Sequence, residues 1–387
     1  MSRITRRRYL AAGGVAALAG CGSVNDGYGN YDPDGVSADG AGTTGAADST
    51  GCAEPIERTD AGQQPPAVPS ASERLPLPRS PSALRQEARS GGPPKDGIPS
   101  IDDPSFANAG SVGFLSEGDP VFGIVRDDVA KAYPQKVLVH HEIVNDTVGD
   151  QSLAVTYCPL TGTVLGFDRG ETTFGVSGRL INNNLVMYDR VSEAWWPQVL
   201  ATAIPGPWNE DPPTVSLREV RLVWTSWERW RTHHPETRVL TTDTGYARNY
   251  GRDPYGSYNP PSGHYKGGST PFARLNPDDR FHPKRVFIGA RTPAGAVAFG
   301  KEALLEAGVM TGRLCETPTL AVADPRLETG YVYLNPERRE FDHDGATVTA
   351  ADGTDYRPEN LPLQRIHAFD AMWFAWSGFY PWTSVHV

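Results

Sequence analysis

Two runs of β-type residues flank a turn near the middle of the chain. Val, Thr and Tyr dominate residues 154–157, and Val, Leu and Phe dominate residues 164–167. Such side chains favour a pleated, half-buried surface, while Pro159 and Gly162 between the runs favour a turn. The pattern predicts a β-hairpin with Cys158 at its mouth.

Further apolar runs predict the elements around this hairpin. Residues 121–126 and 173–178 have the pattern of strands, and residues 182–190 have the pattern of a turn followed by a strand. A proline at position 134 precedes a short segment, 135–139, that could form a helix, because proline is favoured at the start of helices.

A later part of the chain repeats this order of patterns. The corresponding segments are 286–291 with 121–126, 298–305 with 132–139, 320–322 with 153–155, and 329–334 with 162–167. The shared order and spacing predict an internal duplication, in which each copy is a small β-rich unit with one short helix.

Residues capable of chemistry are confined to the first copy. Their counterparts in the second copy are Ala307 for His141, Gly308 for Glu142, and Asp324 or Pro325 for Cys158, depending on one gap. A role in core packing alone would not explain this restriction, so we take these three residues as candidates for a site.

Three aromatic or glycine-rich segments complete the folded part. Tryptophans recurring every three residues within 224–235 predict a packed helix that ends before a proline. Residues 246–266 predict a long loop, and loops of this length are often functional. The aromatic segment 369–382 is too short to span a bilayer and should pack against the core.

The N-terminal residues have the features of an export signal. Consecutive arginines at 6–8 and an apolar run at 11–19 are typical of a twin-arginine signal. The run ends in a lipobox-like sequence at Cys21, so residues 1–21 predict a lipid anchor on Cys21. We therefore expect the mature chain on the outer face of the cytoplasmic membrane, held there through the lipid.

Composition separates a linker from the folded region. Residues 22–97 are rich in Gly, Asp, Ser, Ala and Pro, which predicts a flexible low-complexity stalk. The remaining 98–387 predict a β-rich α+β globular region. Its parts are a first copy at about 119–200, a helical and loop insert at 201–283, a second copy at about 284–350, and a C-terminal aromatic segment at 351–387.

The net charge argues against one class of binding partner, and the cysteine content suggests a disulfide. The formal net charge of -10 argues against nucleic-acid binding. Outside the cell a free thiol tends to be oxidised, so Cys52 could pair with Cys315.

Six motifs in order resemble one protein family. They are residues 132–134, 141–146, 155–163, 174–178, 184–190 and 234–235. Together they resemble the family catalogued as domain of unknown function 3179, from about Ile98 to the C-terminus. The resemblance implies no established activity. In some relatives cysteine or selenocysteine stands at the position of Thr161, so this chain departs from a dithiol pattern.

The first functional hypothesis is a thiol-centred redox site. Thr161 could donate its hydroxyl to a Cys158 thiolate, and His141 could accept the proton or act as the cationic partner. Glu142 or Asp168 would then orient His141. A complete redox cycle would need an external thiol or Cys315.

Two alternatives stay open. Cys158 and His141, with His140 or Met187, could hold copper or zinc, although no short-spaced ligand motif is present. The chain could instead bind a small ligand or an envelope protein without catalysis. In that case the polar residues of the binding pocket would be Ser177, Asn182 to Asn184, Asp189 and Arg190. The structural alternatives are turn formation for the asparagines and an ion pair between Asp189 and Arg190.

Overall fold

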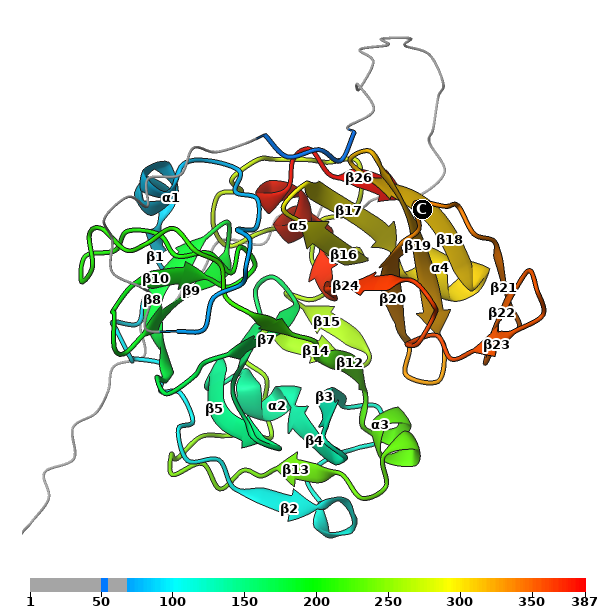
Figure 1. The fold of residues 1–387 in the computed structure, drawn as a ribbon. Helices are drawn as coiled ribbons and strands as arrows, with labels where there is room; N and C mark the ends of the chain where they lie inside the picture. The colour runs from blue at the N-terminus through cyan, green and yellow to red at the C-terminus, as the bar shows by residue number, and fades with distance from the viewer. Residues whose placement is uncertain (1–49, 55–67) are drawn as a thin grey trace, which may run out of the picture. The chain divides into compact units, whose positions relative to one another are not determined.

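The computed structural model describes residues 50–54 and 68–387. Antiparallel β-strands dominate it, with a few short helices (Figure 1). The predicted β-rich α+β class is therefore confirmed. No helix in these described ranges is long and apolar enough to cross a membrane.

The first sheet is built on the hairpin of β3 (Pro120–Arg126) and β4 (Val129–Pro134). Strand β12 (Val223–Ser226) pairs antiparallel with β3, and β13 (Arg238–Leu240) pairs parallel with β4. Strand β2 (Phe106–Asn108) extends the far edge. Two strands of this sheet, β12 and β13, thus come from the segment predicted as an insert.

The second sheet carries Cys158. After the short helix α2 (Gln135–Leu138), β5 (Ile143–Val148) and β6 (Gln151–Cys158) form one hairpin, and β6 and β7 (Thr163–Asp168) form the next. Strand β11 (Glu219–Val220) pairs with β7 at the edge. The predicted Cys158 hairpin and the short helix are both present.

Most strands of a third sheet follow this hairpin in the sequence. Its order is β1 (Arg89–Ser90), β8 (Phe174–Ile181), β9 (Asn184–Asp189) and β10 (Trp195–Pro197). A bulge between Val176 and Arg179 interrupts the pairing of β8 with β9.

The later part of the chain begins with a sheet of the same design. Strands β16 (Val286–Thr292) and β17 (Gly295–Gly300) form the central hairpin. Strand β25 (Ala368–Met372) pairs antiparallel with β16, and β26 (Ser384–His386) pairs parallel with β17. The order β25-β16-β17-β26 therefore matches β12-β3-β4-β13 in both position and direction.

The strands that follow also match. Helix α4 (Lys301–Ala307) leads into β18 (Val309–Leu314), β19 (Thr317–Asp324) and β20 (Thr329–Leu334), which form a meander. Strand β24 (Gln364–Ile366) pairs with β20 as β11 pairs with β7. The remaining small elements are η1 (Ala109–Ser111), β14 (Gly256–Tyr258), β15 (Pro261–Gly263), β21 (Phe341–His343), β22 (Val348–Ala350) and β23 (Asp355–Tyr356).

One packing device recurs in both halves. Helix α3 (Trp227–His233) places Trp230 on Gly123 of β3, and helix α5 (Trp373–Phe379) places Trp376 on Gly289 of β16. Each indole Nε1 donates a 3.0 Å hydrogen bond to a threonine seven residues later. Trp224 lies in β12, so the predicted tryptophan helix begins later than expected.

We call the elements β3 to β7 with β12, α3 and β13 the first β-unit, and β16 to β20 with β25, α5 and β26 the second β-unit. Their registers align Gly123 with Gly289 and Cys158 with Asp324. The expected matches of 121–126 with 286–291, of 153–155 with 320–322 and of 162–167 with 329–334 are therefore each wrong by one residue, whereas the match of 132–139 with 298–305 is in register. An origin by duplication stays a prediction, as do the domain boundaries.

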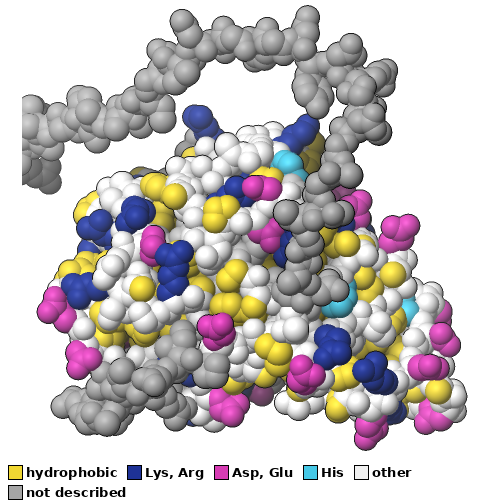
Figure 2. Space-filling view, turned by 90° about the horizontal axis from the view of Figure 1, so that it is seen from above, with side chains coloured by type: hydrophobic (Ala, Val, Ile, Leu, Met, Phe, Trp, Pro, Cys, Tyr) yellow, Lys and Arg dark blue, Asp and Glu magenta, His cyan; other side chains and the backbone are white. Residues whose placement is uncertain are grey.

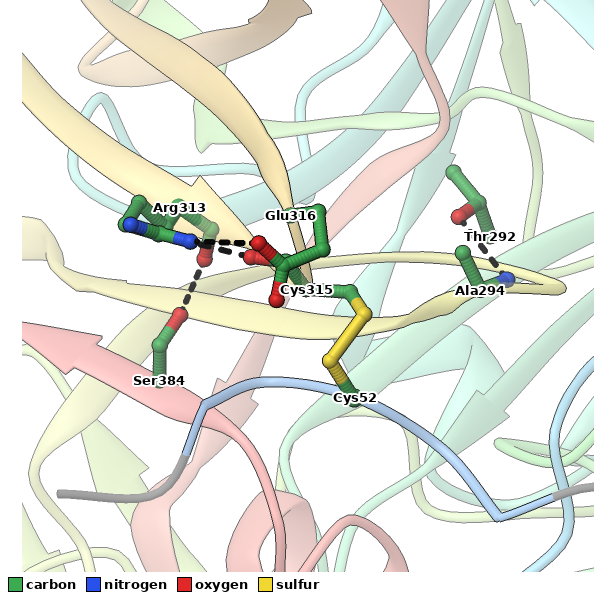
Figure 3. The surroundings of a disulfide bond; sticks show 7 residues. All are labelled: Cys52, Thr292, Ala294, Arg313, Cys315, Glu316 and Ser384. Carbon is green, nitrogen blue, oxygen red and sulfur yellow. Dashed lines mark hydrogen bonds and ion pairs between the residues drawn. A yellow bond between two sulfur atoms is a disulfide. The ribbon is translucent and has the colours of Figure 1, made fainter.

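The predicted stalk is wrong over its C-terminal part. Residues 81–87 form helix α1 (Pro81–Glu87), and Leu75, Leu77 and Leu84 are buried in the core. A disulfide joins Cys52 to Cys315 in the turn between β18 and β19, so it ties the early segment to the second β-unit (Figure 3). The predicted pairing of these cysteines is thus present. Cys21 and the rest of the export signal lie outside the described residues.

The outer face shown in Figure 2 carries charges of both signs, which are interspersed rather than gathered in one patch. The C-terminal aromatic segment packs inward, as expected, because every residue of α5 is buried.

We predict that Gly123→Ala and Gly289→Ala each lower the free energy of unfolding by about 1–3 kcal/mol, because overpacking forces side chains out of place. An added Cβ would lie 2.2 Å from the ring of Trp230 or Trp376. Urea unfolding followed by tryptophan fluorescence measures the change. Gly110→Ala is the matched control, since its Cβ would meet nothing within 4 Å; equal effects at all three positions would contradict the packing explanation.

Candidate functional site

Cys158 ends β6 and faces the interior rather than solvent. It pairs with Thr163 across the hairpin, and the residue is only 1% exposed. The thiol donates a 3.6 Å hydrogen bond to the carbonyl of Asn183. Among the described residues Cys158 is the one cysteine outside a disulfide.

Burial controls the protonation of this thiol. Burial first, and the nearby carboxyl of Glu142 second, raise the pKa of Cys158 to about 11. The hydroxyl of Thr161 and the backbone amides of Thr161 and Leu185 lower the pKa without offsetting burial. The thiol is therefore protonated at neutral pH, which differs from the activated thiolate that the thiol hypothesis requires.

Thr161 lies beside Cys158, as the Cys-x-x-Thr spacing predicts, but it belongs to a buried hydrogen-bond network. Thr163 donates to Gln198 Oε1 at 2.7 Å, so the 2.8 Å contact between Thr161 and Thr163 uses the Thr161 hydrogen. Asn184 Nδ2 donates to Thr161 Oγ1 at 3.0 Å. In this network Thr161 fixes the turn rather than holding a thiolate.

The backbone of Glu142 adopts a conformation that favours glycine. Its φ is 58°, and its amide hydrogen-bonds to the carbonyl of Leu138 at the end of α2. Gly308 takes the same place in the second β-unit, with φ 76° and the equivalent bond to Leu304. The predicted alignment of Glu142 with Gly308 therefore holds, and a side chain at this position carries strain of about 1–3 kcal/mol.

The carboxyl of Glu142 is buried without a polar partner. The residue is 7% exposed, and no described residue donates a hydrogen bond to its carboxyl or forms an ion pair with it. Its oxygens are not among the fully enclosed side-chain atoms without a partner, because they open onto a cavity. Burial raises the pKa of Glu142 to about 8. A neutral carboxylic acid therefore stands close to the Cys158 thiol at pH 7.

Two other predicted acid–base residues do not join this pair. Both ring nitrogens of His141 are engaged elsewhere: Nδ1 lies 2.8 Å from the Pro99 carbonyl, and Nε2 lies 2.7 Å from the Tyr250 hydroxyl. Asp168 pairs with Leu153 at the opposite end of β7 from Thr163. Five residues of strand separate it from the Cys158 end by roughly 16 Å, so Asp168 cannot orient a group there.

A cavity of about 370 Å³ opens onto Glu142. Most of its wall is apolar or aromatic, and the charged or titratable side chains that reach it are Glu142, Arg179, Tyr255 and His264. The apolar lining includes Ile98, Leu160, Val176, Leu180, Leu185 and Phe272.

The predicted long loop at 246–266 supplies two further parts of the site. Tyr255 lines the cavity, and its pKa is raised mainly by burial and then by Glu142 and Cys158. His264 Nε2 lies 2.8 Å from the carbonyl of Leu160, within the Cys158 turn, and 2.8 Å from Nζ of Lys284. The loop therefore covers the end of the Cys158 hairpin. The sequence alone did not identify any residue of this loop as part of the site.

Lys284 comes from the segment just before β16. Burial lowers its pKa to about 8, and its interaction with Cys158 opposes that change. Burial also lowers the pKa of His264. Sequence reasoning missed both residues because each reaches Cys158 only through the tertiary fold; the histidine within a long loop was the one available signal.

The predicted ligand-binding residues have structural partners instead. None of the four lines the cavity. Ser177 Oγ donates to the Val186 carbonyl in the bulge, and Asn184 belongs to the Thr161 network. Asp189 accepts hydrogen bonds from its own turn and from Trp196, whereas Arg190 pairs with Asp102 and Asp96. The expected pair between Asp189 and Arg190 is therefore wrong.

The neighbouring asparagines hold the loop that borders the cavity. Asn182 Oδ1 accepts from the Leu275 amide at 2.8 Å, and Asn183 Oδ1 accepts from the Phe272 amide at 2.8 Å. Their role is thus to place Phe272 at the wall.

The copper or zinc hypothesis receives no support from the described part of the chain. The one cluster of three such ligand side chains found there is Cys52, Cys315 and Glu316, and its two sulfurs are joined as a disulfide. His141 has no free ring nitrogen, and His140 Nε2 lies 3.1 Å from the Arg252 carbonyl.

Comparison with known proteins yields one match. A family model described as "Protein of unknown function (DUF3179)" matches residues 95–383. No curated protein and no solved structure matches the chain.

We predict that the stability difference between the wild type and Glu142→Gln depends on pH. Glu142 has a folded pKa of about 8 and a usual value of 4.5, so the folded state binds the extra proton between these values. Stability of the wild type therefore falls as pH rises from 4.5 to 8, by about 2–5 kcal/mol relative to the variant. Urea unfolding at pH 5 and pH 8 measures it; parallel curves would show that the carboxyl is hydrated.

We also predict that Glu142→Gly stabilises the fold at pH 8 by about 1–3 kcal/mol, because glycine relieves the positive φ and the buried charge disappears. The reciprocal control Gly308→Ala should destabilise, since its Cβ would lie 2.7 Å from the His343 ring at the same φ. Thermal and urea unfolding measure both; a destabilised Glu142→Gly would show that the side chain is retained for packing.

Proposed function

The chain belongs to the DUF3179 family, and we propose that it binds a small, largely apolar molecule and acts on it through Glu142 and Cys158. The match covers most of the chain but assigns no activity, so the proposal rests on the site itself.

The state of Glu142 is the observation that carries this proposal. A buried carboxyl without a hydrogen-bond partner costs several kcal/mol to ionise, and the positive φ adds strain. The aligned position in the second β-unit is glycine, which avoids both costs. A fold that accepts these costs at one of two matching positions has kept the carboxyl for a purpose beyond stability.

The cavity limits the molecule that could use this carboxyl. Its volume of about 370 Å³ lies in the range of small-molecule sites, and such sites combine an apolar wall with few polar groups. Glu142 would donate a hydrogen bond to the ligand below pH 8 and accept a proton above it. This favours a compact apolar ligand with one polar group.

Cys158 does not itself line the cavity, but it interacts with Glu142, which does, and in this proposal Cys158 supplies the nucleophile. When its sulfur bonds to an electrophilic carbon, the thiol proton passes to ionised Glu142 or to the ligand. A redox cycle is the second candidate, but Cys52 and Cys315 are bonded to each other. No resolving thiol is therefore available among the described residues, and an external thiol would have to complete the cycle.

The setting of this activity is proposed from the N-terminal sequence. A twin-arginine signal with a lipobox at Cys21 would place the folded domain on the outer face of the cytoplasmic membrane. The lipid would be its contact with the membrane, and the acidic balance argues against nucleic-acid partners.

We predict that N-ethylmaleimide alkylates Cys158 through the cavity, with a rate that rises about tenfold per pH unit up to pH 10. The cause is a thiol pKa of about 11, whereas an ordinary cysteine levels off near pH 9. Peptide mapping by mass spectrometry measures the rate at Cys158 separately from Cys21. Glu142→Gln should accelerate labelling above pH 8, where the wild-type carboxyl is charged.

Two further measurements test whether N-ethylmaleimide reaches Cys158 through the cavity. Leu180→Trp should slow labelling at least tenfold by filling the cavity, and saturating 2-naphthol should protect Cys158. Val191→Trp is the matched control, because Val191 is 69% exposed and does not line the cavity. A rate that levels off below pH 9, or that Leu180→Trp leaves unchanged, would overturn the proposal.

A further inference from the structure

Tyr255 lines the Glu142 cavity, and its hydroxyl has no partner among the described residues. The residue is half-buried, and its one hydrogen-bonding side-chain contact is made by its backbone amide rather than by the phenol. By contrast, the hydroxyls of Tyr157, Tyr258 and Tyr265 in the same region are each hydrogen-bonded. The Tyr255 oxygen is not fully enclosed by protein. A hydroxyl in this state is available to a ligand in the cavity.

Glu142 presents a second such group to the same cavity. Its carboxyl also lacks a hydrogen-bond or ion-pair partner in the described part of the chain. The two groups interact electrostatically, since Glu142 has the largest effect on the Tyr255 hydroxyl after burial. Both also interact with Cys158, which places them in one part of the cavity.

Hydrogen bonds from one short helix fix the backbone positions of both residues. Asp253 accepts from the Tyr255 amide at 2.7 Å and from Gln135 Nε2 at 2.7 Å. Gln135 begins α2, and at the end of α2 the Leu138 carbonyl accepts from the Glu142 amide at 2.7 Å. The spacing of the two groups is therefore set before a ligand binds, which lowers the cost of binding it.

The hairpin of β14 and β15 holds Tyr255 from the other side. Gly256 pairs with Gly263, and in the next pair outward the His264 amide donates to the Tyr255 carbonyl at 2.7 Å. A Cβ on Gly263 would lie 2.4 Å from that carbonyl, so the pairing requires glycine. The rings of Tyr255 and His264 lie edge to face, with centroids 6.2 Å apart. The tyrosine ring thus has a fixed position at the cavity wall.

We propose that Tyr255 and Glu142 both donate hydrogen bonds to one carbonyl oxygen of the ligand. A carbonyl oxygen has two lone pairs and no hydrogen, so it can accept from both groups at once. Two donors on one oxygen also withdraw electron density from the carbonyl carbon, which makes that carbon more electrophilic. The rest of the ligand would meet the apolar wall, which includes Leu180 and Phe272.

This inference rests on the proposed function, because it assumes that the cavity binds a small molecule. It adds the ligand class, an apolar carbonyl compound, and it adds Tyr255 as a residue that selects this class.

Infrared spectroscopy of a bound ketone tests the proposal on the full-length protein. The probe is 2-acetylnaphthalene with carbon-13 at its carbonyl, measured at pH 6.5. Hydrogen bonds to the oxygen lower the C=O stretching frequency. We expect the bound frequency to lie below its value in cyclohexane. Tyr255→Phe and Glu142→Leu should each raise it, and the double variant should raise it most.

Binding affinity provides a second readout. Tyr255→Phe should weaken binding of 2-acetylnaphthalene about tenfold, the usual effect of one hydrogen bond, and binding of the oxygen-free 2-isopropylnaphthalene less than about twofold. Equilibrium dialysis measures both. Tyr246→Phe is the matched control, because Tyr246 belongs to the same loop, is 45% exposed and does not line the cavity.

Three outcomes would overturn the inference. They are a stretching frequency that Tyr255→Phe leaves unchanged, equal losses of affinity for the ketone and the hydrocarbon, and a ketone that does not bind although 2-naphthol protects Cys158. In each case the proposed function stands. The proposed function fails on a separate result, namely labelling of Cys158 that Leu180→Trp leaves unchanged.

Discussion

The site depends on a buried ion pair that joins the second β-unit to β11, the strand paired with β7 of the first β-unit. Arg291 of the second β-unit is fully buried and donates to Glu219 of β11 at 2.8 Å and to the Val199 carbonyl at 2.7 Å. Removing one partner of such a pair costs about 3–5 kcal/mol, because it leaves an uncompensated charge. Cys158 and Glu142 belong to the first β-unit and Lys284 precedes the second, so this contact, together with the hydrogen bond from the Met372 amide to the Thr161 carbonyl, keeps them in one region.

Matching positions in the two β-units carry different residues with different interactions. Asp324 stands where the first β-unit has Cys158, and its carboxylate binds Arg326 at 2.8–2.9 Å. Gly308 stands where the first β-unit has Glu142 and accepts the left-handed backbone without strain. The first β-unit thus differs from the second in placing a carboxyl without a hydrogen-bond partner beside a cavity, near a thiol that donates to the Asn183 carbonyl. Unsatisfied groups of this kind are expected where a ligand completes the structure.

Local sequence pattern predicted the strands and the hairpin because alternating apolar residues and turn residues act over short distances. It also identified Cys158 and Glu142, through the comparison between the two copies. It failed for Asp168, since five residues of strand separate it from the thiol, and for His141, whose ring turns toward Tyr250. His264 and Lys284 could not be predicted, because their positions follow from how a long loop and the second β-unit dock. The motif residue Thr161 was placed correctly beside the sulfur.

The order in which the buried groups titrate explains how a site without an activated thiolate could work. Glu142 and Lys284 both change charge near pH 8, and Cys158 follows near pH 11. Ionised Glu142 makes the thiolate harder to form, so the pair gives up its protons one after the other. Near neutral pH Glu142 and Cys158 are therefore both protonated and uncharged, which suits a ligand that accepts a hydrogen bond from the Glu142 carboxyl. Cys158 would therefore react only after a ligand has bound. That ligand would either accept the Glu142 proton or be an electrophile that bonds to the sulfur directly. The resting site thus favours chemistry that begins with ligand binding over thiol exchange with solvent.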